Sequence, residues 1–145
     1  MQVSSKFTIA IHILTAIAYF KDTQKETSSS LAGSIGANPV IVRNVMGKLK
    51  EAGIIHVSQG QSGIKLAKDV EDISLYDIYH AVENIEETGL FRFHENPNAN
   101  CPVGRNIHVA VDPHLIDAQE AMETSLKSVS LKTIVDDTNN AIISE

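Results

Sequence analysis

The segment Thr27–Leu66 constrains the fold more than any other part of this 145-residue chain. Its first residues, Thr27–Ser30, offer several N-caps for a short helix, and Gly36 follows that helix as a natural C-terminal residue. Asn38 can cap a second helix, and Pro39 suits that helix's first position. The pattern therefore predicts two short helices joined by a tight turn.

The second of these helices is expected to end near Ala52, and its two faces differ in chemistry. One face has apolar residues at i, i+3, i+4 and i+7, the spacing of a buried stripe: Val42, Val45, Met46 and Leu49. The opposite face mixes small, polar and basic residues: Val40, Arg43, Asn44 and Lys48, with Gly47 between them. Polar residues opposite a core are common, but this mixture beside a tight turn is typical of a helix that reads nucleic acid.

Two β-prone runs follow, Ile54–Ser58 and Ile64–Ala67. Two glycines among the five residues between them permit the positive φ angles of a hairpin tip; the five are Gln59, Gly60, Gln61, Ser62 and Gly63. An ordinary surface hairpin would have this pattern too. Directly after a candidate recognition helix, however, the hairpin is expected to be a wing, and the order helix, turn, helix, hairpin is that of a winged helix-turn-helix.

Charge is distributed unevenly along the chain. Residues 1–68 hold eight Lys and Arg against three Asp and Glu, a net of +5, whereas residues 69–145 hold four against fifteen, a net of −11. The two add up to the −6 of the whole chain. A basic front on an acidic body indicates that the front binds a polyanion.

The apolar segment Ile9–Phe20 has the outline of a secretory signal, because it follows Lys6. However, His12 and Thr15 interrupt it, and it is too short to span a membrane. We therefore expect a first core helix capped by Ser4 or Ser5, in one compact cytoplasmic domain without a membrane segment. A single cysteine excludes an internal disulfide and fits a reducing compartment.

The acidic half should be mainly helical. A capping box at Ser74–Asp77 opens a helix to about Glu83, and 86–107 reads largely as loop. Asp112-Pro113 is expected to start a longer helix that ends near Ser128. A short helix should follow Ser130, with a frayed tail beyond Asp137. The fold class is therefore mainly α with a small β-hairpin wing and a long C-terminal helix.

Several motifs together resemble those of the bacterial Rrf-type winged-helix regulators, the family of IscR, NsrR and CymR. They are Ser4-Ser5-Lys6, Leu31–Gly36, Asn38-Pro39, Leu49–Ile55, the glycine-containing hairpin, Ile73–Ile78, Ala81-Val82-Glu83 and Cys101–Gly104. The resemblance covers nearly the whole chain. It implies a winged helix-turn-helix DNA-binding region at 1–84, a sensor loop at 85–108, and a dimerisation helix and tail at 109–145.

The resemblance also implies a homodimer on a near-palindromic double-stranded DNA operator, with two recognition helices in successive major grooves roughly 34–36 Å apart. Lys6, Ser28, Ser29 and Ser30 would hold phosphates; Asn38, Pro39, Val40, Arg43 and Asn44 would face base edges; Gln61 and its neighbours would form the wing tip. The dimer would join through the stripe Leu115, Ala118, Met122 and Leu126.

Arg43 is the preferred base-reading residue, because a guanidinium can bridge guanine O6 and N7. A phosphate-only role for Arg43 stays open. Wings in the family often carry an arginine and three or four glycines, whereas this wing has Gln59 and two glycines. A deep minor-groove arginine contact from the wing is therefore not expected.

Cluster-binding members of the family use several cysteines in the loop before the dimerisation helix, but here that loop holds Cys101 alone. An iron–sulfur cluster takes four protein ligands, so one thiolate with His94, His108 or His114 is a poor match. The spacing follows no common zinc motif either. We expect no iron–sulfur cluster, no metal and no other cofactor.

Cys101 could instead act as a thiol switch. If Pro102 opens a helical turn, the dipole of that turn and Arg105 would favour the thiolate, which reacts with oxidants far faster than the thiol does. Modification of Cys101 would then move the dimerisation helix and change DNA affinity. A buried, inert cysteine is the alternative.

These observations predict a homodimeric DNA-binding transcriptional regulator, a repressor that senses redox state through Cys101. Two alternatives stay open: a regulator that binds a small ligand near the 86–107 loop, and a winged-helix protein-interaction module that does not bind DNA. An enzyme is not expected. The six histidines are scattered, and neither a Ser-His-Asp pattern nor a glycine-rich phosphate loop is present.

Overall fold

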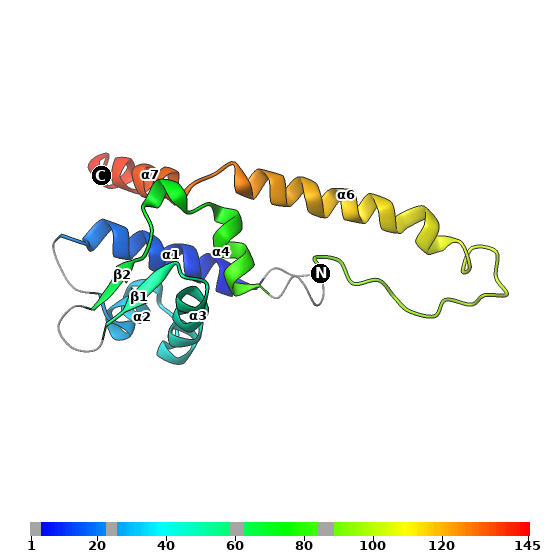
Figure 1. The fold of residues 1–145 in the computed structure, drawn as a ribbon, viewed down its shortest axis with the longest axis horizontal. Helices are drawn as coiled ribbons and strands as arrows, with labels where there is room; N and C mark the ends of the chain where they lie inside the picture. Colours follow the sequence, from blue (N-terminus) through cyan, green and yellow to red (C-terminus); the bar gives the residue numbers. More distant parts are fainter. Residues whose placement is uncertain (1–3, 23–25, 59–62, 84–88) are drawn as a thin grey trace.

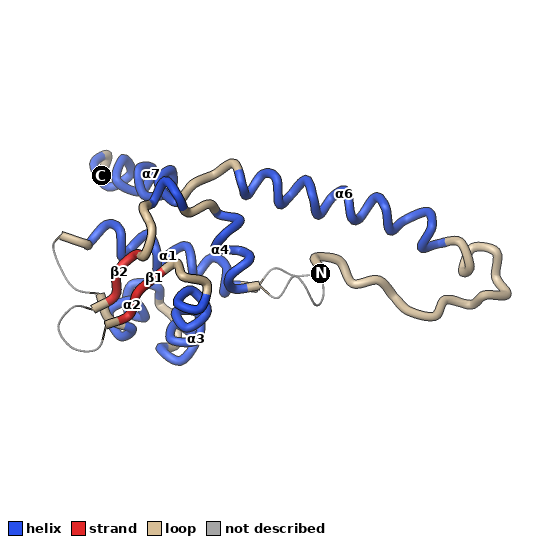
Figure 2. Tube along the Cα trace, in the orientation of Figure 1, coloured by secondary structure: helices blue, strands red, loops and turns tan. Residues whose placement is uncertain are grey.

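The computed structural model describes residues 4–22, 26–58, 63–83 and 89–145 of the chain. The elements follow the order α1 (Ser5–Phe20), α2 (Ser28–Ile35), α3 (Pro39–Glu51), β1 (Ile55–Val57), β2 (Ile64–Leu66), the 3₁₀ turn η1 (Val70–Asp72), α4 (Leu75–Val82), α6 (Ile107–Lys127) and α7 (Leu131–Ile143). In Figure 1, α1 to α4, α7 and the hairpin form one body, from which α6 projects. Figure 2 shows how much of this architecture is helical. The predicted fold class is confirmed.

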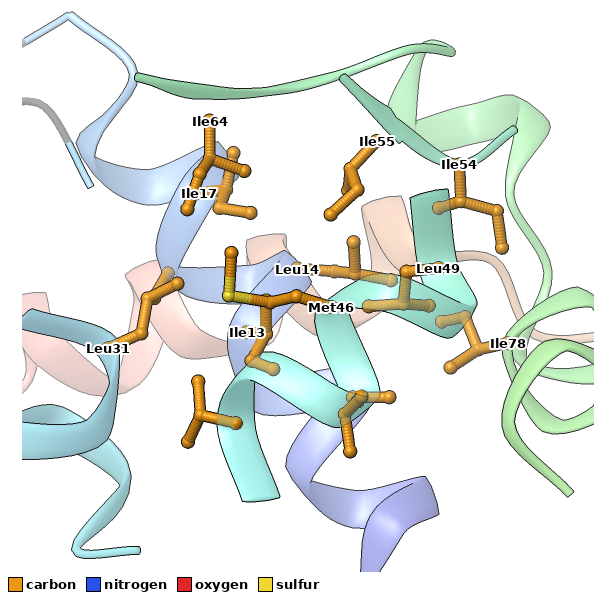
Figure 3. Packing of buried hydrophobic residues seen from close by; sticks show 14 of the residues in the cluster. Ile13, Leu14, Ile17, Leu31, Met46, Leu49, Ile54, Ile55, Ile64 and Ile78 are labelled. Carbon is orange, nitrogen blue, oxygen red and sulfur yellow. The ribbon is translucent and has the colours of Figure 1, made fainter. Parts of the chain in front are cut away.

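The core lies where α1, α2, α3, α4, α7 and the hairpin meet, and it is almost entirely aliphatic (Figure 3). Side chains from every one of these elements are buried in it. They include Ile13 and Leu14 of α1, Leu31 of α2, Leu49 of α3, Ile55 of β1, Ile78 of α4 and Leu131 of α7. Because α1 packs against α2, α3, α4, α7 and β2, it is the central scaffold on which the surface elements are placed.

The first helix is the expected core helix. Ser4 is its cap, and the Ser4 hydroxyl oxygen accepts a hydrogen bond from the backbone N–H of Lys6 at 3.3 Å. The buried stripe of α1 includes Ala10, Ile13 and Ile17. None of the helices in the described ranges is long and apolar enough to cross a membrane.

The long helix α6 begins earlier than predicted, which corrects the sequence interpretation. It starts at Ile107 rather than at Asp112-Pro113, and Pro113 lies inside it. The turn before the proline is supported by a 3.0 Å contact between His108 Nδ1 and Asp112 Oδ1, one helical turn apart. Pro113 has no backbone N–H to donate to the carbonyl oxygen of Val109, one helical turn earlier. Val109 is 78% exposed, so water can hydrogen-bond that oxygen instead.

The C-terminal tail is also better ordered than predicted. Helix α7 continues beyond Asp137 to Ile143 rather than fraying. Its first turn is tied to α4 by a bridge between Ser74 and Ser130 and by a 2.7 Å bond from Leu131 N to Ile73 O. Val135 packs against the core one turn further on. Because residues 136–140 are all polar, their sequence did not indicate that this helix packs against the core.

Candidate nucleic-acid interface

The turn between α2 and α3 has the predicted geometry. Thr27 and Ser30 form a reciprocal capping box at the start of α2, and Gly36 ends that helix with a left-handed φ of 73°. The side chain of Asn38 accepts a hydrogen bond from Val40 N at 2.8 Å, and Pro39 occupies the first position of α3. Both caps are therefore satisfied within the turn, and α2 packs directly against α3.

Helix α3 is divided into a buried and an exposed face, as its sequence pattern predicted. Val42, Val45, Met46 and Leu49 are buried against the core. Arg43, Asn44 and Gly47 are exposed, and Val40 retains 63% of its accessible surface. Within the described part of the protomer, Arg43 and Asn44 take part in no side-chain hydrogen bond or ion pair, so their polar groups are available to a ligand. The structure brings these predicted residues together on one surface.

Lys48, another predicted DNA contact, is placed differently. Its side chain is half-buried, and Nζ donates a hydrogen bond to the backbone oxygen of Val82 at 3.4 Å. Val82 is the last residue of α4, so the ammonium group lies at the negative end of that helix. The side chain of Lys48 therefore contacts α4 of its own protomer instead of extending into solvent.

The three serines predicted to hold phosphates lie in the first turn of α2, and Lys6 lies in the first turn of α1. Ser29 is exposed and Ser28 is half-buried. The Ser30 hydroxyl is already used, because it accepts from Thr27 N at 2.9 Å and lies 2.9 Å from a carboxylate oxygen of the buried Glu26. Of these three serines, only Ser30 uses its hydroxyl in a hydrogen bond among the described residues.

The hairpin forms as predicted, with β1 and β2 antiparallel and slightly shorter than expected. It closes through a 3.0 Å bond from Ser58 N to Gly63 O, and Gly63 has a φ of 66°. Four of the predicted wing residues, Gln59, Gly60, Gln61 and Ser62, lie outside the described residues.

The exposed side of the hairpin carries a basic pair that the sequence analysis did not single out. His56 and Lys65 are directly opposite each other in the register, and both are exposed. Each neighbours a buried isoleucine, Ile55 on β1 and Ile64 on β2. The alternation of buried and exposed residues along each strand is the signal that could have identified the pair.

The described part of the predicted sensor loop, residues 89–106, has no regular helix or strand. It is attached to α6 by a 3.0 Å bond from Leu90 N to the side-chain oxygen of Gln119. A groove of about 750 Å³ lies between loop and helix and is lined by residues such as Phe93, His94 and His108. The rings of His94 and His108 lie 5.0 Å apart.

Cys101 lies half-buried in a turn near the end of this loop. Its backbone oxygen accepts from Arg105 N at 3.0 Å, so Pro102 does open one helical turn, although α6 itself starts later. The Arg105 guanidinium donates to Ala99 O at 3.2 Å. Gly104 is required here, because a Cβ would lie 2.4 Å from the Asn98 carbonyl oxygen.

The predicted dimerisation stripe lies along α6, which has no buried residue in the protomer. Ala118 is exposed, and Leu115, Met122 and Leu126 are only half-buried. Other apolar side chains of this helix are exposed as well: Val109 is 78% and Ile116 is 49% accessible. A long helix with so much apolar surface in water is typical of one that packs against a partner.

The α2–turn–α3 unit, the hairpin and the exposed polar face of α3 together define a winged helix-turn-helix DNA-binding protein. Residues 3–137 match the model of the family Rrf2, described as "Iron-dependent Transcriptional regulator". The chain is 43% identical over 133 residues to the HTH-type transcriptional regulator YwnA of Bacillus subtilis (strain 168), covering 92% of this chain and 96% of that protein. The chain belongs to the Rrf2 family of transcriptional regulators.

Solved structures agree with this assignment. One crystal structure of a DNA-binding protein is 38% identical, with a TM-score of 0.72, and covers 90% of this chain and 98% of that one. The oxidised form of Staphylococcus aureus CymR shares the fold at 20% identity and a TM-score of 0.69, covering 93% of this chain and 96% of that one. The matched family and YwnA are both described as transcriptional regulators rather than enzymes, so the chain is a DNA-binding transcriptional regulator.

The family's description mentions iron, for which this chain offers few of the usual thiolate donors. Cys101 is the only thiol in the sequence, and a cluster is normally held by four ligands. Within the described ranges, no three His, Cys, Asp or Glu side chains are grouped so that they could hold a metal ion.

Proposed function

We propose that this regulator is a homodimer that represses transcription by binding a near-palindromic operator through α3. The observation that carries the proposal is the exposed face of α3, where Arg43 and Asn44 have no partner among the described residues of their own protomer. The cap at Asn38 fixes the start of that helix, so its polar face is presented without reorganisation. An exposed helix face whose polar side chains are free to reach base edges suits major-groove readout.

The homodimer is supported by α6. The stripe predicted for the dimer remains accessible in the protomer, because Ala118 is exposed and Met122 and Leu126 are only half-buried. A two-fold dimer would cover this surface and would place two recognition helices on one face of a duplex, which accounts for a near-palindromic site. Repression then follows if the bound dimer occludes a promoter.

The test of DNA recognition is to select duplexes from a random pool with the wild-type protein and then measure affinity as a function of salt. We expect a two-fold symmetric site whose binding weakens steeply between about 50 and 200 mM salt, as counterions return to the phosphates. Arg43→Met and Asn44→Ala should each abolish the preference for the selected site. Lys132→Met is the matched control, because it removes one exposed positive charge on α7, away from α3.

The oligomeric state has its own experiment. Ala118→Glu adds a charge to a side chain that is exposed in the protomer, so it should leave the protomer folded but yield monomers in sedimentation. Glu120→Arg, on the opposite face of the same helix, is the control and should remain dimeric. Dimers that persist in Ala118→Glu would contradict the assignment of this stripe.

We further propose that Cys101 connects oxidation to DNA release without a metal cluster. Its thiolate would attack one oxygen of hydrogen peroxide; the O–O bond breaks, hydroxide leaves, and the sulfur is oxidised to sulfenic acid while the peroxide is reduced. A small thiol would then form a mixed disulfide with release of water. The half-exposed position of Cys101 and the crystallised oxidised form of the CymR relative favour this reading.

Cys101→Ser provides the test of the switch. Peroxide should weaken binding of the wild type to the selected duplex, and the serine variant should retain its affinity after the same treatment. Equal loss in both proteins would show that the oxidant acts elsewhere. That result would favour a small ligand in the groove between residues 89–96 and α6 as the signal.

A further inference from the structure

The carboxyl end of α4 is joined to the first helix by a carboxylate. Both the hydroxyl and the backbone N–H of Ser4 donate to the same oxygen of Glu83, at 2.7 and 3.1 Å. Ser4 is the cap of α1, and its hydroxyl oxygen in turn accepts from Lys6 N. Hydrogen bonds to a charged acceptor are about twice as strong as neutral ones, so Glu83 fixes the start of α1 and the backbone of Lys6.

The same end of α4 is joined to the recognition helix. Lys48 Nζ donates to Val82 O at 3.4 Å, in the residue directly before Glu83. The last carbonyls of a helix have no partner within it and carry partial negative charge, so a cation is stabilising there. Lys48 is half-buried, and its long side chain lies back over α4 instead of extending from the exposed face of α3.

Helix α4 is well suited to hold both elements, because it packs against α1 and α3 as well as α6. Ile78 and Val82 are buried in these contacts. Its other end is anchored by the bridge from Ser74 to Ser130, and Lys127 of α6 lies 4.5 Å above the ring of Tyr76. The carboxyl end of α4 therefore connects the C-terminal helices to two segments that are expected to meet DNA.

We propose that Glu83 and Lys48 are positioning residues for DNA recognition. Glu83 sets the start of α1 through Ser4, Lys48 sets the angle of α3 through Val82, and neither side chain contacts the duplex. The proposal rests on the assignment of α3 as the recognition helix. It also gives Lys48 a role other than the DNA contact predicted from sequence.

Lys48→Met tests the positioning role of Lys48, because methionine keeps much of the apolar stem and removes the charge. The probe is the duplex enriched from the random pool by the wild type, titrated at several salt concentrations. A positioning role predicts at least a fivefold loss of affinity with an unchanged slope of log affinity against log salt. A phosphate contact would instead lower the magnitude of the slope by about one, as expected for Arg43→Met if Arg43 meets phosphate, and would overturn the proposal.

Glu83→Ala and Glu83→Gln test the positioning role of Glu83, and both remove the same negative charge. Long-range electrostatics alone would make both variants bind DNA more tightly. Positioning predicts that Glu83→Ala binds several-fold more weakly and that Glu83→Gln, whose amide oxygen can still accept from Ser4, retains most of the affinity. The amide of Lys6 should exchange faster in Glu83→Ala than in Glu83→Gln.

Two further outcomes would overturn the proposal: tighter binding by both Glu83 variants, or wild-type affinity in Lys48→Met. Urea unfolding of each variant separates loss of positioning from loss of fold. Failure of the proposed function has a different signature, because the wild type itself would then show no salt-dependent binding to any selected duplex.

Discussion

The side-chain oxygen of Asn38 lies 2.8 Å from the backbone nitrogen of Val40 and caps the recognition helix. An N-cap of this kind contributes about 1 kcal/mol. We therefore predict that Asn38→Ala lowers the free energy of unfolding by about 1 kcal/mol in urea titration. Asn38→Ser, which retains a capping oxygen, should be close to the wild type, and equal destabilisation by both changes would contradict the capping role.

Gly47 lies on the exposed face of α3, where an added Cβ would meet nothing within 4 Å. Gly47→Ala should raise the free energy of unfolding by about 0.5–1 kcal/mol, since glycine is costly in a helix interior. The same methyl group should weaken binding to the selected duplex, because it stands beside Arg43 and Asn44. Gly36→Ala is the stability control and should be destabilising by about 1 kcal/mol, given its left-handed φ of 73°. A more stable Gly47→Ala with undiminished affinity would place the duplex elsewhere.

The two helical prolines should respond to alanine in opposite directions. Pro113→Ala should raise the free energy of unfolding by about 2 kcal/mol, because it restores a hydrogen bond inside α6 and removes a clash. Pro39→Ala should lower it by about 0.5 kcal/mol, because proline at a first helical position stabilises by restricting the unfolded chain. Urea unfolding at one protein concentration checks both, and a loss of stability in Pro113→Ala would show that α6 needs the proline.

Tyr79 should make stability depend on pH in the alkaline range. Burial, and then the nearby carboxylates of Glu83 and Glu123, raise the pKa of Tyr79 above its usual value of 10.0. A group whose pKa is raised on folding stabilises fully below its unfolded pKa and loses that contribution as the pH rises through the folded pKa. The free energy of unfolding should therefore fall above about pH 10 more steeply in the wild type than in Tyr79→Phe. Parallel curves for the two proteins would remove Tyr79 as the cause.

Local signals in the sequence were sufficient to predict the two helices α2 and α3 and the turn between them. Thr27, Gly36, Asn38 and Pro39 act within three or four residues of themselves, so capping and turn chemistry could be read directly. The apolar spacing of α3 likewise fixed which of its faces is buried. The same rules placed the start of α6 too late, because Pro113 was read as a helix start although the turn before it is helical.

Long-range partners had no such signal. Lys48 meets a carbonyl 34 positions away, and Ser4 meets a carboxylate 79 positions away. Neither pair has a spacing that a periodic pattern could reveal. The sequence pattern grouped Lys48 with the DNA-reading residues of α3 and gave Glu83 no partner, so only the packing of α4 could assign them.

Helix α6 has 21 residues and buries none of them in the protomer. Most helical stability in proteins comes from packing an apolar face. The backbone hydrogen bonds of α6 are therefore only weakly stabilised by packing within the protomer. Its amides should open far more often than those of α1 or α3, which share the aliphatic core. Hydrogen exchange along α6 would therefore report assembly with a partner, whereas exchange in α1 would report global unfolding. Association and folding could therefore be measured separately in the same molecule by hydrogen exchange.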